Sequence, residues 1–193
     1  MPQIARESLL SLEAYARSRS EFRARVIAHK QRRTVHVGEH LTLLFEDELT
    51  VRYQVQEMLR IERIFEEEGI RSELDAYNPL VPDGSNWKAT MLLEYPDSVE
   101  RRARLAELKG IEQRVWVQVD GGERVFAIAD EDLERENDEK TSSVHFLRFE
   151  LAPATIEALR RGAGLTIGAD HPRYQASVEI GADTRRSLAE DLA

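Results

Sequence analysis

Two consecutive helices predicted in the first third of the chain carry charged side chains of opposite sign within their apolar faces. With residues placed about 100° apart, the helix predicted over residues 8–32 has three basic residues in its apolar arc, which are Arg19, Arg23 and Lys30. The helix predicted over residues 49–67 has three polar or acidic residues in or beside its arc, which are Gln54, Glu57 and Glu62. Because burying an unpaired charge is costly, these groups are expected to contact one another or a bound ligand.

Two hypotheses explain this arrangement. In the first, the cations hold a carboxylate or phosphate group, while the polar residues of the second helix orient it or act as acid and base. In the second, the six residues form an internal salt-bridge network between antiparallel helices. An ion pair is then predicted between the two helices, namely Arg19 or Arg23 with Glu57 or Glu62. Charges around an open cavity would favour the first hypothesis, and charges that are paired and sealed would favour the second.

The chain has no cysteine, which excludes disulfides, thiolate chemistry, iron–sulphur sites with protein thiolates and the commoner structural zinc sites. A metal would have to be held by His, Asp and Glu. Glu57 and Glu62 are five residues apart, whereas helical carboxylate-bridged metal sites favour a spacing of about three or four. We therefore predict no bound metal and no resident cofactor.

The composition is typical of a globular protein that buries a substantial core, with 193 residues of which 41% are hydrophobic and 33% charged. A single domain over residues 1–193 is expected, and the alternative is a helical part, 1–87, followed by a sheet-rich part, 88–193. No stretch approaches the roughly 18 apolar residues of a membrane span, and the N-terminus lacks a leader-like apolar run. A cytoplasmic location without a membrane partner is the resulting expectation.

The charge is distributed unevenly along the chain. Residues 1–34 contain eight basic and three acidic residues, a net charge of +5, which leaves −14 for the remainder of a chain with a total of −9. A nucleic-acid-binding protein would favour the opposite overall sign. We therefore expect no nucleic-acid partner, and expect the arginine-rich first helix to pack on the acidic body of its own chain.

The expected fold class is α+β, with an N-terminal helix–hairpin–helix unit packed against a mainly antiparallel sheet and short helices. The hairpin spans residues 34–46 and turns at Gly38-Glu39. Further strands are predicted over residues 88–95, 113–119, 123–128, 142–151, 165–168 and 173–180. Short helices are predicted over residues 72–77, 98–108 and 153–161.

The histidines are considered as metal ligands or general bases. His36 and His40 resemble a chelating pair, but a two-residue turn pairs Val37 with His40 and sends His36 to the opposite face, so that a metal clip needs a wider turn. His145 alternates with the apolar residues of a predicted strand and is interpreted as a core histidine. His29 suits the C-terminal end of a basic helix.

Asp170-His171-Pro172 joins two predicted strands and leaves two alternatives open. In a functional site, Asp170 would orient the His171 ring toward a ligand. In a simple turn, Asp would bond its own backbone and Pro would set the dihedral angle. The catalytic candidates are Asp170 and His171 in this connection and Glu57 on the second long helix. The same two alternatives, a functional site or a simple turn, apply to a proline-bearing loop with Tyr77, Asn78 and Asp83.

Three segments resemble a bacterial family known only as a domain of unknown function, and the likeness covers nearly the whole chain. They are FE at 45–46 followed by LTVRYQVQEMLRIERI at 49–64, ELDAYNPLVPDG at 73–84, and TSSVHFLRFEL at 141–151. The family has no established activity and no assigned catalytic residues. The resemblance implies a genomic context, because members tend to be encoded beside rubrerythrin and iron–sulphur oxidoreductases. It thus implies a role near peroxide or thiol redox chemistry.

Two functions follow as hypotheses. In the first, the protein is a non-catalytic accessory or interaction protein of a cytosolic redox system, with rubrerythrin or an iron–sulphur oxidoreductase as its partner. In the second, it is a small enzyme or ligand-binding protein that holds an anionic small molecule between its first two long helices, with Asp170-His171 at the rim. The sequence leaves open whether the protein is an enzyme and which oligomeric state it adopts.

Overall fold

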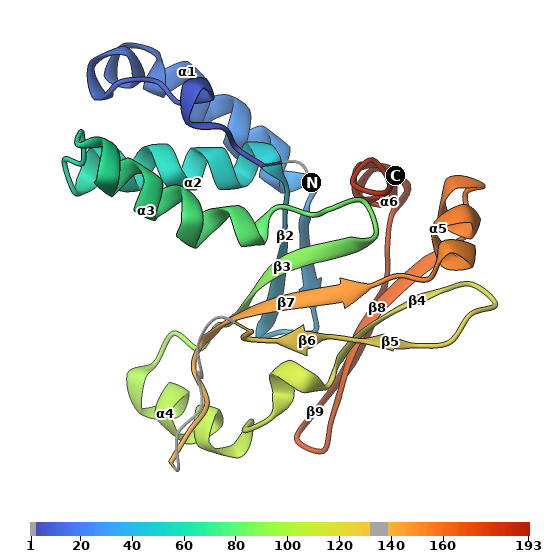
Figure 1. Cartoon of the computed structure of the whole chain (residues 1–193). Coiled ribbons are helices and arrows are strands. Elements are labelled where there is room, and N and C mark those ends of the chain that lie inside the picture. The colour runs from blue at the N-terminus through green and yellow to red at the C-terminus, as the bar shows by residue number, and fades with distance from the viewer. Residues whose placement is uncertain (1–2, 132–138) are drawn as a thin grey trace.

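A computed structural model describes residues 3–131 and 139–193 and has an α+β fold with two antiparallel sheets (Figure 1). The first sheet has the order β1 (Thr34–Val37), β2 (Leu41–Glu46), β3 (Asn86–Leu93), β7 (Val144–Glu150) and β6 (Ile128–Ala129). The second has the order β5 (Val125–Phe126), β4 (Val115–Val119), β8 (Leu165–His171) and β9 (Tyr174–Glu179). The α+β prediction is confirmed, although two sheets replace the expected single one.

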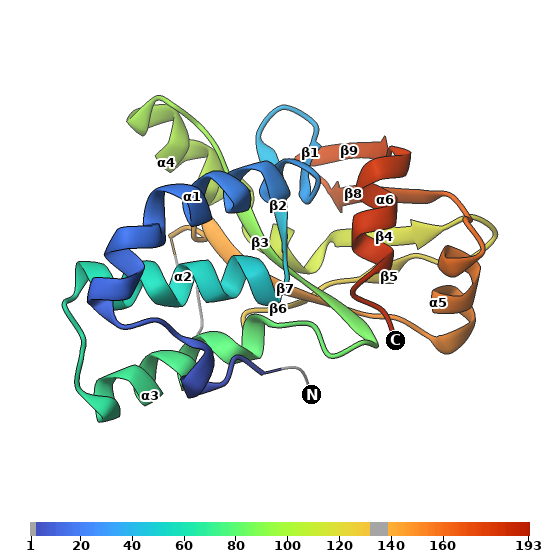
Figure 2. The ribbon, with the colours of Figure 1, turned by 90° about the horizontal axis from the view of Figure 1, so that it is seen from above.

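Three helices lie side by side against the first sheet, as Figures 1 and 2 show: α1 (Leu12–Gln31), α2 (Glu48–Ile61) and α3 (Glu67–Tyr77). Helix α4 (Ser98–Glu107) follows the end of β3, whereas two short helices lie beside the second sheet, namely α5 (Pro153–Arg160) and α6 (Ala182–Ala189). Short 3₁₀ turns occupy Arg6–Ser8, Asn78–Leu80 and Ile111–Gln113. No helix in the described ranges combines the length and the apolar character needed to cross a membrane.

Local signals set the ends of the long helices. Ser11 caps α1 by accepting a hydrogen bond from the Ala14 amide, and Asp47 forms a reciprocal capping box with Thr50 at the start of α2. The prediction of one helix over residues 49–67 is wrong at its end, because α2 stops at Ile61 and Arg63 adopts a left-handed φ of 54°. The chain then re-enters a helix at Glu67, and so the short turn predicted over 72–77 is part of a longer α3.

The β1–β2 hairpin has a wider turn than predicted. Val37 pairs with Leu41 rather than with His40, which leaves three residues in the turn. Gly38 has a φ of 73°, and a Cβ atom there would lie only 2.7 Å from the Tyr174 hydroxyl oxygen. That hydroxyl donates to the Val37 carbonyl at 2.6 Å and accepts the amides of His40 and Leu41. The hairpin is thereby tied to the second sheet through β9, and it pairs with β3 in the first sheet.

Alternation along β3 separates two environments. One set of its side chains joins a continuous core that takes residues from both sheets, including Trp87, Ala89, Met91, Leu93, Val115, Val117 and Val119. The intervening side chains, among them Lys88 and Thr90, face the helices, which have a smaller apolar core of their own. The first sheet also combines strands from both of the parts, 1–87 and 88–193, that the sequence offered as an alternative division.

The C-terminal segment is attached to the first sheet through a buried arginine. The guanidinium of Arg33 donates to the carbonyls of Phe45 at 2.9 Å, Glu46 at 3.1 Å and Ser187 at 3.0 Å. It also donates to the Asp191 carboxylate at 2.5 Å. Burial raises the pKa of Asp191 to about 6, although attraction by Arg33 acts in the opposite direction.

Candidate functional site

The structure brings two of the predicted helix-face residues together. Arg19 donates from Nε and Nη2 to the two carboxylate oxygens of Glu57 at 2.7 and 2.9 Å. Tyr15, which is fully buried, donates its hydroxyl to Oε1 of the same carboxylate at 2.7 Å. These hydrogen bonds, that of Arg19 above all, lower the pKa of Glu57 to about 2. Burial, followed by the contact with Glu57, raises the pKa of Tyr15. The predicted ion pair between the two helices is confirmed for Arg19 and Glu57.

The other four candidates of this group lie elsewhere. Arg23, Gln54 and Glu62 are exposed, and the Lys30 ammonium lies 5.6 Å above the centre of the Tyr53 ring. The helical periodicity also placed Ile27 and Ile61 in the apolar arcs of the two helices, and these arcs were too wide, because the fold leaves Ile27 43% and Ile61 58% exposed. The six residues therefore do not line one common cavity, and the charges that meet between α1 and α2 are paired with each other.

The β1–β2 turn is wider than predicted, but His36 and His40 still do not form a chelating pair. His36 Nδ1 lies 3.0 Å from the Thr42 hydroxyl, whereas the His40 ring stacks on Tyr95 with centroids 4.1 Å apart. His171 accepts the Arg173 amide on Nδ1 and directs Nε2 to the Lys109 carbonyl, and both bonds hold the β8–β9 turn. The residues described here contain no group of three or more His, Cys, Asp or Glu side chains that could hold a metal ion.

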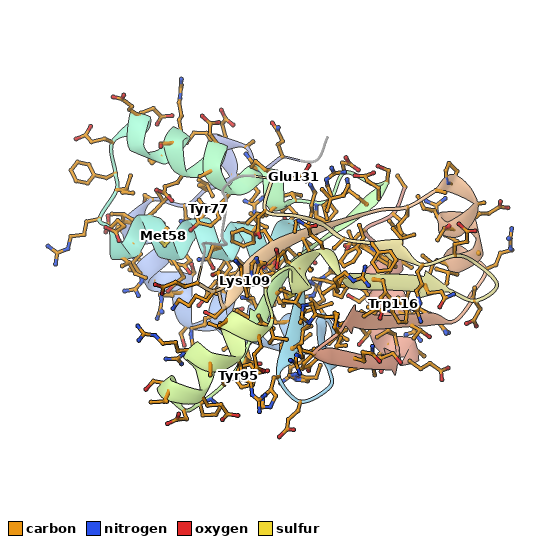
Figure 3. All side chains as sticks on the ribbon, turned by 90° about the horizontal axis from the view of Figure 1, so that it is seen from below. Met58, Tyr77, Tyr95, Lys109, Trp116 and Glu131 are labelled. Atoms are coloured by element: carbon orange, nitrogen blue, oxygen red, sulfur yellow. The ribbon has the colours of Figure 1, made fainter. Side chains whose placement is uncertain are left out.

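Asp170 turns away from the neighbouring histidine. Its carboxylate lies 3.6 Å from an Arg124 nitrogen and 3.9 Å from an Arg114 nitrogen. The guanidinium of Arg124 in turn lies 4.1 Å from the centre of the Trp116 ring (labelled in Figure 3). Asp170 therefore does not orient the His171 ring, and the predicted turn is also wrong for it, because Asp170 lies within β8 and its carboxylate faces Arg124 and Arg114.

His145 is buried, as predicted, and has polar partners on both ring nitrogens. Nδ1 lies 2.5 Å from the Asp130 carboxylate, while Nε2 lies 2.9 Å from the Thr141 hydroxyl and 3.0 Å from the Ser142 carbonyl. The connectivity of Thr141, His145 and Asp130 is that of a catalytic triad. The Thr141 hydroxyl, however, also lies 3.4 Å from the Glu112 carboxylate, to which it can donate instead of to the ring. Because Thr141 is also only 1% exposed, we interpret the group as a structural network.

A pocket of about 580 Å³ lies between the α2–α3 pair and the outer face of β3 and β7; we call it the Lys88 pocket. Figure 3 shows three of its lining residues, Met58, Tyr77 and Glu131. Its apolar lining includes Met58, Ala76, Tyr77, Leu80 and Phe146, and its charged lining consists of Glu73, Lys88, Glu131 and Arg148. A mainly apolar concavity with a few charged groups is typical of a small-molecule site.

The sheet register explains how the two cations of this pocket come together. Lys88 on β3 is directly opposite Arg148 on β7, so the two side chains emerge on the same face of the sheet. Arg148 donates from Nε and Nη2 to both oxygens of Glu131 at 2.7 Å, and it also contacts Glu150. These contacts raise the pKa of Arg148 and engage all three of its nitrogens.

Lys88 differs from Arg148 in having no such partner. Within residues 3–131 and 139–193, its ammonium group takes part in no hydrogen bond or ion pair. Burial lowers the pKa of Lys88, and repulsion by Arg148 adds to the effect. The pocket thus offers a half-buried amine beside an apolar surface, with a second cation close by that is already neutralised.

A comparison with protein families matches residues 3–192 to a family described as a protein of unknown function, DUF3501. The chain belongs to this family. Among solved structures, it is similar to the crystal structure of a protein of unknown function from Burkholderia pseudomallei K96243. The two chains are 59% identical, each is covered over 100% of its length, and the TM-score is 0.95. The comparison with curated proteins finds no match. The predicted membership of a bacterial family of unknown function is thus confirmed, while the genomic association with redox proteins stays a prediction.

The Lys88 pocket of this DUF3501 chain was not predicted from the sequence. The sequence offers Tyr77 as a candidate, but it places Lys88 and Arg148 only in predicted strands. One signal was available: each is a cation flanked by apolar residues in a strand, and cations in such strands emerge on the face opposite the core. Their pairing across two strands could not be read without the register.

Proposed function

We propose that the protein binds a small, largely apolar molecule in the Lys88 pocket and holds one oxygen-bearing group of that molecule, a carboxylate or a carbonyl, at Lys88. The observation that carries the proposal is the half-buried ammonium of Lys88, which has no hydrogen-bond partner among the described residues. A half-buried cation without a protein partner has lost part of its hydration, and a ligand oxygen would supply the missing contact. Arg148 cannot serve in the same way without releasing Glu131.

The sequence placed a bound anionic molecule between the first two long helices, α1 and α2. We place the ligand in the Lys88 pocket instead. The space between α1 and α2 offers less to an anion, because the Arg19 guanidinium already spans both oxygens of Glu57. The Lys88 pocket combines a cation with the apolar side chains of Met58 and Phe146. Such a lining favours a ligand whose body is apolar over a small inorganic anion.

Octanoate is a suitable probe, since it joins a carboxylate to an apolar chain. Calorimetric titration is expected to show binding to the wild-type protein and an affinity at least about tenfold weaker for Lys88→Met, which keeps the apolar stem but removes the charge. Lys30→Met is the matched control, because Lys30 lies near the α1–α2 interface rather than in the pocket. Absence of binding to the wild type, or equal weakening by Lys30→Met, would contradict the proposal. Circular dichroism confirms that each variant is folded.

We also propose that the protein serves as a cytoplasmic accessory to a redox partner, either rubrerythrin or an iron–sulphur oxidoreductase. The family resemblance and the cysteine-free sequence support this, because a chain without thiols contributes assembly, delivery or regulation rather than thiol electron transfer. Calorimetric titration against each candidate partner is expected to give heat that decreases from low to physiological salt, since exposed charges are screened over about 8 to 10 Å. No heat at either salt concentration would remove this role and leave the ligand-binding proposal in place.

A further inference from the structure

Resting on the proposed function, we propose that the ligand of the Lys88 pocket is an aldehyde or ketone and that the Lys88 amine captures its carbonyl carbon as an imine. Three features of the molecule support this reaction, namely the presence of a lysine at position 88, the surroundings of its amine, and the other groups that line the pocket.

The chain uses lysine rarely. It contains four lysines, at positions 30, 88, 109 and 140, among 27 basic residues. A guanidinium remains protonated in proteins and is a poor nucleophile, whereas an amine can lose its proton and attack a carbon atom. Arginine is the usual cation of this protein. The lysine at position 88 therefore gives the pocket a potential nucleophile, which an arginine would not.

The surroundings of Lys88 are those that activate an amine. It is half-buried against apolar side chains, and the register places Arg148 directly opposite on the neighbouring strand. Desolvation favours the neutral, nucleophilic form of a lysine, and so does a nearby cation, although the carboxylates of Glu131, Asp83 and Glu150 act on Lys88 in the opposite direction. The lowered pKa of Lys88 agrees with this geometry. Glu131 keeps Arg148 in place by a two-point hydrogen bond, so the second cation is a fixed part of the pocket.

The reaction needs no oxidant, reductant or further reactant. The neutral nitrogen of Lys88 attacks the carbonyl carbon, a C–N bond forms, and the carbonyl oxygen gains a proton to give a carbinolamine. That oxygen then leaves as water, and the nitrogen, having lost both of its protons, forms the C=N bond. Glu73 lines the same pocket and is a carboxylate that can relay these protons. The apolar lining holds the body of the carbonyl compound, as in the proposed function.

Reductive trapping tests this inference. The wild-type protein is incubated with octanal and cyanoborohydride, which converts an imine into a stable secondary amine, and peptide mass spectrometry measures the label at each of the four lysines. At neutral pH, Lys88 is expected to be labelled about tenfold faster than Lys30, Lys109 or Lys140. Octanoate in excess is expected to suppress the label at Lys88 and to leave the other three unchanged. In Lys88→Arg, the label at position 88 should disappear.

The outcomes separate this inference from the proposed function. If octanoate binds in a Lys88-dependent manner but octanal labels all four lysines equally, the imine chemistry is overturned and the pocket remains a non-covalent site. If octanoate does not bind and Lys88 is not labelled preferentially, both proposals fail. Preferential labelling that octanoate does not suppress would also overturn the inference, because the reactive amine would then lie outside the ligand site.

Discussion

Replacing Arg33 with methionine is expected to lower the free energy of unfolding by about 3 to 5 kcal/mol. Arg33 is only 1% exposed, and its guanidinium is hydrogen-bonded to three backbone carbonyls and to the Asp191 carboxylate. Methionine fills a similar volume but leaves these acceptors without a donor. It also leaves the Asp191 carboxylate buried without its cation, and this loss is the largest part of the expected effect.

The loss of unfolding free energy in Arg33→Met, relative to the wild type, is expected to increase as the pH rises. The pKa of Asp191 is raised to about 6, above its usual value of 3.8, so the folded protein takes up a proton more readily than the unfolded chain. This group therefore favours folding most at low pH, and its contribution declines as the pH rises through 6. Without Arg33 the pKa of Asp191 rises further. The deficit should thus be larger at neutral pH than at mildly acidic pH, as measured by urea unfolding.

Two further variants make the test specific. Arg32→Met changes an exposed neighbour of the same residue type and should leave the free energy of unfolding within about 0.5 kcal/mol of the wild type. Arg33→Met combined with Asp191→Asn removes both charges and should recover part of the deficit at neutral pH. If the double variant is no more stable than Arg33→Met alone, the unpaired carboxylate is not the source of the loss.

The strands of this protein could be predicted because their side chains alternate clearly. The strand predicted over residues 173–180 corresponds to β9, in which Tyr174, Ala176 and Val178 are half-buried between exposed neighbours. Helix α6 was not predicted, since most of its residues are polar. Its packing depends on Leu188 and on the buried contact of Ser187 with Arg33, which lies 154 positions away in the sequence. A contact between residues so far apart in the sequence produces no local sequence pattern from which the helix could be predicted.

The break between α2 and α3 was missed for a different reason. Helices commonly end at a glycine in the left-handed conformation, but here Arg63 adopts that conformation and gives no sequence signal. This error in the helix end also affected the predicted site residues. A single helix over 49–67 placed Glu62 within an apolar arc, whereas the structure has it exposed at the C-terminal end of α2. Of the two glutamates, Glu57, five residues earlier, is the one that meets Arg19.

The Lys88 pocket could not have been predicted from local pattern. Its walls come from α2, α3, β3 and β7, so that Met58, Lys88 and Arg148 are far apart in the chain. The strand register that brings the two cations together depends on the pairing of β3 with β7. By contrast, an ion pair between α1 and α2 could be predicted from the sequence, since helical periodicity alone placed Arg19 and Glu57 on facing sides of the two helices.

Replacing Glu57 with glutamine is expected to lower the free energy of unfolding by about 1 to 2 kcal/mol at neutral pH. Glutamine retains an acceptor for the buried Tyr15 hydroxyl, so the change mainly removes the charge that faces Arg19. The Arg19 side chain is 33% exposed, and solvent screening keeps the loss below that of a sealed ion pair. Glu62→Gln, an exposed change on the same helix end, is the control and should have no measurable effect.

The contribution of Glu57 to the free energy of unfolding should disappear as the pH falls, whereas that of Asp191 decreases as the pH rises. Hydrogen bonds lower the pKa of Glu57 from 4.5 to about 2, so the unfolded chain takes up a proton before the folded protein does. The stabilisation is therefore complete above pH 4.5 and is lost as the pH falls toward 2. Urea unfolding across this interval should bring the wild type and Glu57→Gln together at the acidic end. A difference that stays constant over the whole interval would mean that the carboxylate charge does not stabilise the contact between α1 and α2.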